Sequence, residues 1–190
     1  DKNNERYLGK SVLGAVNLIN TKISKKLKGY NIHDQVRIDT LMINLDGTKQ
    51  KSRIGANTIL AVSMAVKKLS AKVKKLPLYK TFLVKKNFQL PYPLMNIING
   101  GAHANNNLRI QEFMIRPDRA KKFSEAMRIC FLVIKNLNIL IKNKRLSTAV
   151  GDEGGFAPMI SNNLQALDLI VNAIKKSGFI NGKDVSICLD

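Results

Sequence analysis

The sequence predicts an α/β chain in which residues 1–88 are mainly helical and residues 89–190 form the first part of an α/β barrel. Two observations carry this prediction. Apolar residues recur at helical spacing as far as Pro77, whereas after Pro93 they gather in short runs bounded by glycine or proline. In the second part the strand-like runs alternate with helical ones and end in polar residues, as barrel strands do.

Three helices are predicted in the first part, and a helix-breaking residue follows each: residues 13–23 before Gly29, 36–45 before Gly47, and 59–73 before Pro77. The second helix is the least regular. A polar stretch at residues 85–89 is the best linker candidate. The apolar positions that define the helices are Leu13, Val16, Ile19 and Ile23; Val36, Leu41, Ile43 and Leu45; and Ile59, Val62, Val66, Leu69 and Val73.

The second part is predicted to contain, in order, a strand, a strand, a helix, a helix and a strand, at residues 94–98, 110–115, 123–141, 164–174 and 185–190. Pro117 ends the second strand, and Asp118 is expected to cap the helix that follows. Asp190 closes the last strand, which is where barrel enzymes place their ligands. The apolar positions of the two helices are Phe123, Met127, Cys130, Ile134, Leu137 and Ile141, then Leu164, Leu167, Val171 and Ile174.

The net charge of +19 admits a nucleic-acid partner, because basic patches neutralise phosphates. However, the excess is mostly lysine, spread as pairs along the helices, and no aromatic residues are interleaved as in a base-stacking platform. Lysine, asparagine and isoleucine are the residues that AT-rich codons favour, so a bias in nucleotide composition is the favoured explanation. A basic nucleic-acid-binding protein remains the alternative function.

Length and composition indicate one domain, or one and a part of another. With 190 residues and 45% hydrophobic content, the chain can bury roughly 70% of its unfolded surface. No apolar run approaches the roughly 20 residues of a membrane span, and the N-terminus lacks the apolar region of a signal peptide. Cys130 and Cys188 lie in apolar surroundings without metal-ligand spacing, which favours reduced cysteines in the core of a cytosolic protein.

Two motifs set acidic residues beside paired glycines: residues 99–103, which lead into 110–113, and residues 150–158. Glycine lets the backbone turn sharply and approach a ligand closely. The carboxylates of Glu112, Asp152 and Glu153 are therefore expected on loops able to enclose a small molecule. This pattern favours a site for metal-assisted acid/base chemistry.

Each of these polar residues also has a purely structural explanation. Asp152 and Glu153 suit ordinary turns, and His103, between glycines and asparagines, suits a mobile surface loop. Glu112 lies in an apolar strand, where an unpaired carboxylate is costly to bury. Either a function or an ion pair with Arg109, the nearest cation in the sequence, accounts for it.

These residues resemble the motifs of the enolase family, the phosphopyruvate hydratases, in their bacterial form. The matching segments follow the family's order and are MNIINGGAHA at 95–104, QEFMI at 111–115 and GDEGGFAP at 151–158, with LDGT at 45–48 and GANTILAVS at 55–63. The resemblance implies the helical remainder of an enolase-like N-terminal domain at residues 1–88. It implies the first part of an enolase-type barrel, similar to a TIM barrel, at residues 89–190.

The resemblance implies reversible dehydration of 2-phospho-D-glycerate to phosphoenolpyruvate in glycolysis, with Mg²⁺ as cofactor. Glu153 matches the acid that helps the hydroxyl group leave as water, and Glu112 supports it. His103, Gln111 and Glu112 match substrate-binding positions. Asp190 matches the first Mg²⁺ ligand, and its hard oxygen suits that ion. The family likeness further implies a cytoplasmic homo-oligomer, with a cell-surface or secreted pool in some members.

The resemblance also leads us to expect an internal fragment. The family's leading β-meander, two further carboxylate ligands, the catalytic lysine and the rest of the substrate clamp have no match in these residues. The isolated chain is therefore expected to lack dehydratase activity. Two local departures stand in the loop beside the substrate phosphate: Asn105 replaces an acid usual in many relatives, and Arg109 replaces a common aspartate.

Overall fold

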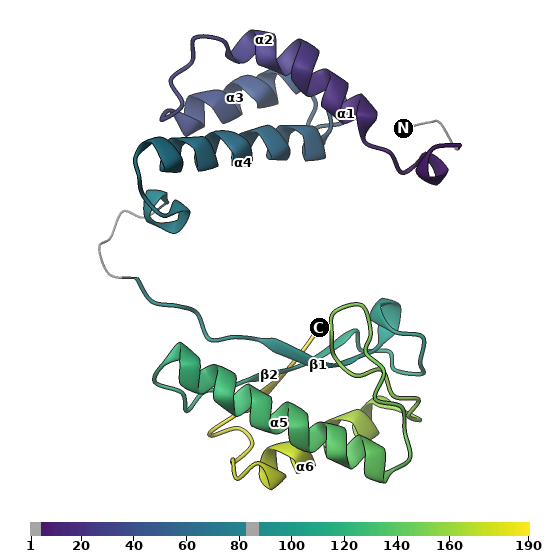
Figure 1. Cartoon of the computed structure of the whole chain (residues 1–190). Coiled ribbons are helices and arrows are strands. Elements are labelled where there is room, and N and C mark those ends of the chain that lie inside the picture. Colours follow the sequence, from purple (N-terminus) through teal and green to yellow (C-terminus); the bar gives the residue numbers. More distant parts are fainter. Residues whose placement is uncertain (1–4, 83–87) are drawn as a thin grey trace. The chain divides into compact units, whose positions relative to one another are not determined.

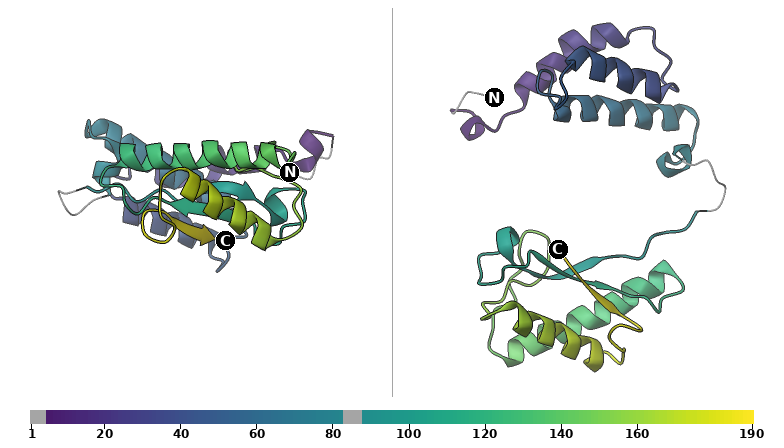
Figure 2. Two further views of the ribbon diagram at one scale, coloured as in Figure 1. Left: turned by 90° about the horizontal axis from the view of Figure 1, so that it is seen from below. Right: turned by 180° about the vertical axis from the view of Figure 1, so that it is seen from behind.

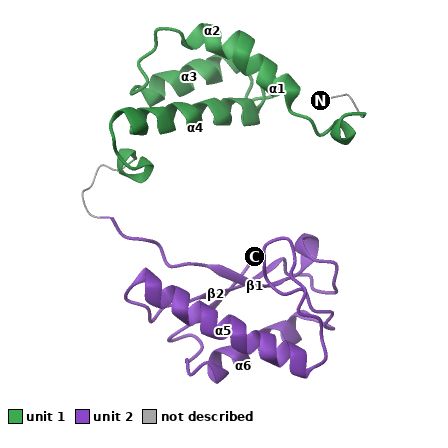
Figure 3. Ribbon diagram, in the orientation of Figure 1, with its two compact units in different colours: residues 1–87 green, residues 88–190 purple. Residues whose placement is uncertain are grey.

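A computed structural model describes residues 5–82 and 88–190, and the chain divides into two compact units, residues 1–87 and 88–190 (Figure 3). Part of the predicted linker, residues 85–87, lies outside the described residues. The predicted class is confirmed: unit 1 is helical, and the strands of the described residues all lie in unit 2 (Figure 1).

Unit 1 consists of helices around a small apolar core, with α1 and α3 each packed against α4 (Figure 1). Its elements in chain order are η1 (Tyr7–Gly9), α1 (Leu13–Leu18), the π-helical turn η2 (Ile19–Ile23), α2 (Ser24–Leu27), α3 (Gln35–Asp46), α4 (Ala56–Val73) and η3 (Leu78–Thr81). The core comprises Ile23, Ile38, Met42, Ile54, Ile59 and Val62.

The three predicted helices of unit 1 are confirmed, but parts of their predicted buried faces are wrong. In α3 the buried residues are Ile38, Met42 and Asp46, whereas Val36 and Ile43 are exposed. Positions four residues apart share one face of a helix. The predicted Leu41 and Leu45 share such a face, but both are only partly buried, and the face that packs inward is the neighbouring one. The other predicted core residues that are exposed are Leu13, Val16, Leu69 and Val73.

A fully buried carboxylate, Asp46, joins the end of α3 to the loop that leads into α4. It accepts hydrogen bonds from the backbone N–H groups of Thr48 (3.0 Å), Arg53 (3.1 Å) and Ile54 (2.6 Å), and from the Thr48 hydroxyl. Burial alone would raise the pKa of this carboxyl, but the hydrogen bonds outweigh burial and lower the pKa to about 2. Asp46 therefore fixes the α3–α4 loop through its charge.

Unit 2 contains a sheet of order β1-β2-β3, formed by β1 (Met95–Asn99), β2 (Glu112–Arg116) and β3 (Ser186–Leu189). β2 is antiparallel to both neighbours, so β1 and β3 run in the same direction. The connection from β1 to β2 contains a 3-10 turn, η4 (Gly101–His103), and no crossover helix, which explains the antiparallel return. The three predicted strands are confirmed, with ends shifted by one or two residues.

Two long helices, α5 (Phe123–Asn143) and α6 (Asn163–Lys176), pack together on one face of this sheet (Figure 2). Both were predicted and both are confirmed. Their predicted faces are wrong at four exposed positions, Phe123, Met127, Leu164 and Val171. Small residues that weigh little in an apolar pattern are buried in the core instead, namely Ala126, Ala166 and Ala173.

Asp118 does not cap α5, contrary to the prediction. The N-cap residue is Lys122, which makes no side-chain capping bond. Asp118 instead accepts hydrogen bonds from the Arg116 guanidinium and the Ser186 hydroxyl, and so ties the end of β2 to the start of β3. Burial raises the pKa of the Asp118 carboxyl, but these two bonds and the Arg116 charge bring it below its ordinary value.

Neither cysteine is in a disulfide, in agreement with the prediction of reduced thiols. Cys130 is buried in α5, and burial raises the pKa of its thiol to about 11. Cys188 is partly exposed in β3. Among residues 5–82 and 88–190, we find no helix with the length and apolar character needed to cross a bilayer.

Candidate functional site

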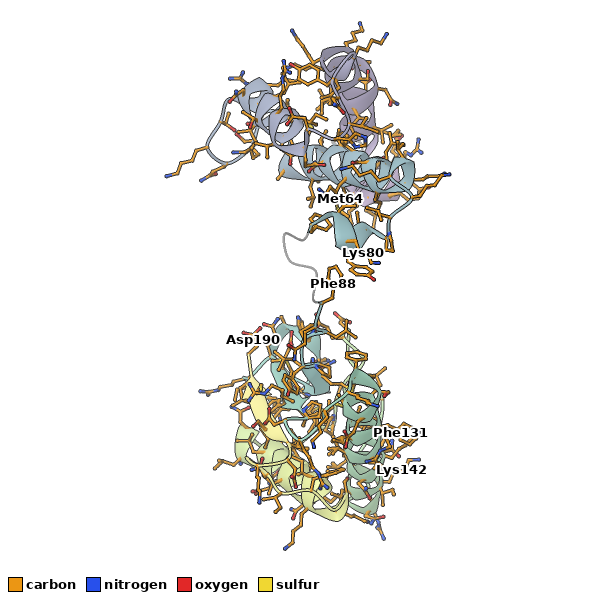
Figure 4. All side chains as sticks on the ribbon, turned by 90° about the vertical axis from the view of Figure 1, so that its left-hand side faces the viewer. Met64, Lys80, Phe88, Phe131, Lys142 and Asp190 are labelled. Carbon is orange, nitrogen blue, oxygen red and sulfur yellow. The ribbon has the colours of Figure 1, made fainter. Side chains whose placement is uncertain are left out.

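Chain segments that are far apart in sequence meet at one edge of the sheet of unit 2. Because β2 is antiparallel, its first residue lies beside the last residue of β1 and the end of β3. Asn99 is the register partner of Glu112. The Glu112 N–H donates to the Asp190 carbonyl (3.0 Å), and the Asp190 N–H donates to the Glu112 carbonyl (3.1 Å). Asp190, labelled in Figure 4, is therefore held in the ladder beside Glu112.

The loop after β1 places His103 over this edge. Backbone bonds from Gly100 to Gln111 and from Gly101 to Leu108 (both 2.9 Å) hold the loop against the chain that enters β2. His103 Nε2 lies 2.6 Å from the side-chain amide nitrogen of Gln111. An amide nitrogen can only donate, so Nε2 accepts, and a neutral ring carries its proton on Nδ1.

The second predicted motif, residues 150–158, supplies the third member of the site. Gly151 donates to the Gly155 carbonyl (2.9 Å) and closes a turn that carries Glu153 at its exposed side. The loop is tied to β1, because the Phe156 N–H donates to the Ile97 carbonyl (2.9 Å). Asp152, next to Glu153 in the motif, is exposed and lies outside the cluster described below.

His103, Glu112 and Glu153 form one cluster, in which a ligand atom from each lies within 4.8 Å of the others. His103 Nδ1 is 3.6 Å from the Glu112 carboxylate, and Nε2 is 3.9 Å from the Glu153 carboxylate. The Glu112 side chain is 17% exposed and that of Glu153 is 49% exposed. Nδ1 is buried and has no hydrogen-bond partner among the described residues, so its proton faces Glu112 without a close acceptor.

The pKa of the Glu112 carboxyl is raised, and burial is the largest cause. The neighbouring Glu153 carboxyl, through its charge and its polar contact with Glu112, is the next largest cause. The Asp190 charge raises the pKa further, and only His103 acts in the opposite direction. Burial and the neighbouring negative charges thus favour the protonated form of Glu112. A carboxyl group in this state can donate a proton to a ligand.

The expected partner of Glu112 is corrected by the structure. Arg109 is exposed, and its backbone N–H donates to Asn163 (3.2 Å). The side chain that faces Glu112 is the imidazole of His103. His103 is thus part of a cluster of side chains, and a description as a surface-loop histidine does not fit its contacts.

A metal ion is the other ligand that such a cluster could hold. Mg²⁺ prefers six oxygen ligands, whereas the cluster offers one imidazole nitrogen and two carboxyls, one of which has its pKa raised by burial and by the charge of the other. The cluster therefore fits proton transfer better than Mg²⁺ binding. Asp190, at the same sheet edge, offers the hard oxygen that suits Mg²⁺.

The sequence reasoning gave no role to Asn99, which is fully buried at the end of β1. One signal in the sequence could have indicated a role for Asn99: it is a polar residue at the end of an apolar strand, just before two glycines. Its contacts with the Glu153 loop could not be read from the sequence, because they join residues far apart in the chain.

Two kinds of comparison bear on this chain. Residues 1–82 match the family described as "Enolase, N-terminal domain", and residues 87–190 match "Enolase, C-terminal TIM barrel domain". The chain is also 80% identical over 190 residues to a protein named enolase from Pelagibacter ubique (strain HTCC1062), across 100% of this chain and 46% of that protein. The chain thus spans about half the length of this curated relative. These matches confirm the resemblance drawn from the motifs and lend nothing to the nucleic-acid alternative.

Proposed function

The chain belongs to the enolase family, and on that premise we propose that the protein carrying this sequence is a lyase that reversibly dehydrates 2-phospho-D-glycerate to phosphoenolpyruvate. We propose that it acts in glycolysis in the cytoplasm, with Mg²⁺, as a homo-oligomer. We assign residues 1–88 to the N-terminal domain and residues 89–190 to the barrel domain. Family membership supports each of these points.

One observation carries the chemical part of the proposal: the Glu112 and Glu153 carboxyls lie together with His103, with a ligand atom of each within 4.8 Å of the others. Dehydration removes a proton from the α-carbon and breaks the C–O bond at the β-carbon. The departing hydroxyl needs a proton to leave as water, while the electron pair from the α-carbon forms the second bond of the product alkene. A carboxyl group held at this place is suited to that transfer.

Glu153 is the better donor of the two, because half of its side chain is exposed on the turn whereas Glu112 lies behind it. The imidazole of His103 lies beside both carboxyls, 3.6 Å from Glu112 and 3.9 Å from Glu153. We place His103, Gln111 and Glu112 in contact with the substrate, with Gln111 fixing the orientation of the imidazole ring.

Asp190 is the residue of this chain that we propose to hold Mg²⁺. When bound, the ion stabilises the negative charge that develops on the substrate carboxylate. The ladder bonds of Asp190 to the residues that begin β2 keep its backbone beside the proton donors. By family likeness, the lysine that removes the α-proton has no match in these residues, so this chain supplies the acid half of the reaction.

The test uses the full-length protein that carries this sequence, with the ultraviolet absorbance of phosphoenolpyruvate as the signal. In Glu153→Gln, which keeps the shape but removes the acid, turnover should fall by roughly 10²-fold or more. The matched control is Asp152→Asn, which removes the same charge one residue away at an exposed position. Equal turnover in wild type and Glu153→Gln, or no product from wild type, would refute the proposal.

A further inference from the structure

Asn99 is a polar residue with no exposed surface, located where β1 ends at the candidate site. Burying a side-chain amide is costly unless its polar atoms are hydrogen-bonded. Its Oδ1 accepts from the Asn96 amide, and its Nδ2 donates to the Gly155 carbonyl (3.4 Å). An apolar residue would fill this position without such requirements, so the amide calls for an explanation beyond core packing.

The amide of Asn99 fills the inside of the turn that carries Glu153. A Cβ added at Gly151 would lie 2.3 Å from Asn99 Nδ2, and one added at Gly155 would lie 2.9 Å from Asn99 Oδ1. The two glycines that close the turn therefore flank the amide. Because Glu153 lies between them in the chain, the position of this amide sets the position of the turn.

The same residue is also joined to Glu112. Asn99 and Glu112 are register partners across β1 and β2, and the Asn99 N–H donates to the Phe156 carbonyl (2.9 Å) at the exit of the Glu153 loop. Asn99 thus contacts the strand that carries one carboxyl and the loop that carries the other. The position of Asn99 therefore affects the distance between the two carboxyls.

We propose that Asn99 is a positioning residue that holds Glu153 against Glu112 for the dehydration step; this inference rests on the proposed function. The His103 loop is tied to β1 in a different way, since the Asn106 side-chain amide donates to the backbone carbonyl of Asn99 (2.9 Å). That bond survives replacement of the Asn99 side chain. Loss of the side chain removes one support of the turn that carries Glu153, while the His103 loop keeps its own bond to β1.

The experiment measures kcat and KM of the full-length enzyme with Asn99→Ala and Asn99→Ser, each in the wild-type and the Glu153→Gln background. Serine is included because it keeps a small polar group that is too short to reach the Gly155 carbonyl. The matched control is Asn136→Ala, which removes an amide that bonds Leu132 and Ser177 in the α5–α6 pair, away from the site.

In the wild-type background, either Asn99 variant should lower kcat by about tenfold or more with KM changed less than about threefold, because a displacement of an ångström misplaces the acid. In the Glu153→Gln background, the further loss should stay below about threefold, because residues that act through one group are not additive. Asn136→Ala should leave kcat within about twofold of wild type, since the hydrogen bonds that it removes join Leu132 and Ser177 and none of the site residues.

Three outcomes would overturn the inference. The first is wild-type kcat in both Asn99 variants. The second is an equal loss in the two backgrounds, which would show a role independent of Glu153. The third is that both Asn99 variants fail to fold while Asn136→Ala folds, which would make the side chain a requirement of the fold. The proposed function fails separately, through an inactive wild type or a fully active Glu153→Gln.

Discussion

Gly100→Ala isolates the effect of a steric displacement at the His103 loop. Gly100 has φ −144° and ψ −159°, an extended conformation that any residue adopts, so backbone strain is not the obstacle. The added Cβ would lie 2.4 Å from the Ile110 carbonyl oxygen and 2.5 Å from Leu108 Cβ, whereas ordinary contact begins at 3.4 Å. The loop and the lead into β2 must therefore separate by about 1 Å, because a packed interior cannot absorb the overlap.

This separation has two measurable consequences in the full-length enzyme. Overpacking of this kind costs roughly 1–3 kcal/mol of unfolding free energy. It also moves His103 away from Glu112, and a misplacement of about 1 Å lowers kcat by roughly 10²-fold. Urea unfolding measures the first consequence, and phosphoenolpyruvate formation measures the second.

The matched control is Gly178→Ala, at the end of α6. Gly178 has φ 81°, and nothing lies within 4 Å of an added Cβ. Left-handed strain should cost roughly 1–2 kcal/mol there, with kcat unchanged. If Gly100→Ala kept wild-type kcat, or if the two variants lost activity equally, the geometric reasoning for the His103 loop would be refuted.

Three further predictions concern stability and reactivity. The pKa of Asp46 is lowered from 3.8 to about 2, so its charge stabilises the folded state above pH 3.8, and this contribution is lost as the pH falls towards 2. The free energy of unfolding of Asp46→Asn, followed by fluorescence, should therefore depend less on pH between these two values than that of the wild type. Leu137→Ala should lower the free energy of unfolding in urea by about 2–5 kcal/mol, because Leu137 is fully buried on the side of α5 that faces the core. A loss below about 1 kcal/mol would contradict this packing. In the native state a thiol reagent should label Cys188 and spare Cys130, whose pKa burial raises to about 11, as peptide mass spectrometry can show.

The elements of the fold were predictable because their signals are local. Gly29, Gly47 and Pro117 end elements for reasons that lie in the backbone of a few residues. The faces of helices were harder to predict, because burial depends on what packs against the helix. In α6, Ala166 and Ala173 are buried and Leu164 is exposed, the reverse of the order that hydrophobicity suggests.

The site was predictable in its members and not in its contacts. The glycine-flanked motifs indicated Glu112 and Glu153 as candidates, yet the sequence suggested Arg109 as the partner of Glu112. The structure gives that place to His103, because the loop between β1 and β2 folds back over the sheet edge. The position of Asn99 in the site was not predicted for a related reason, since its side chain contacts a loop that lies far along the chain.

The central claim is that Glu153, which lies beside Glu112, donates the proton with which water departs. The most direct test is exchange of the α-proton of 2-phospho-D-glycerate with solvent deuterium, followed by NMR in full-length Glu153→Gln. The account predicts that exchange persists within about tenfold of wild type while phosphoenolpyruvate formation falls by roughly 10²-fold or more, because only the second step needs this acid. Loss of exchange and product formation by the same factor would contradict it.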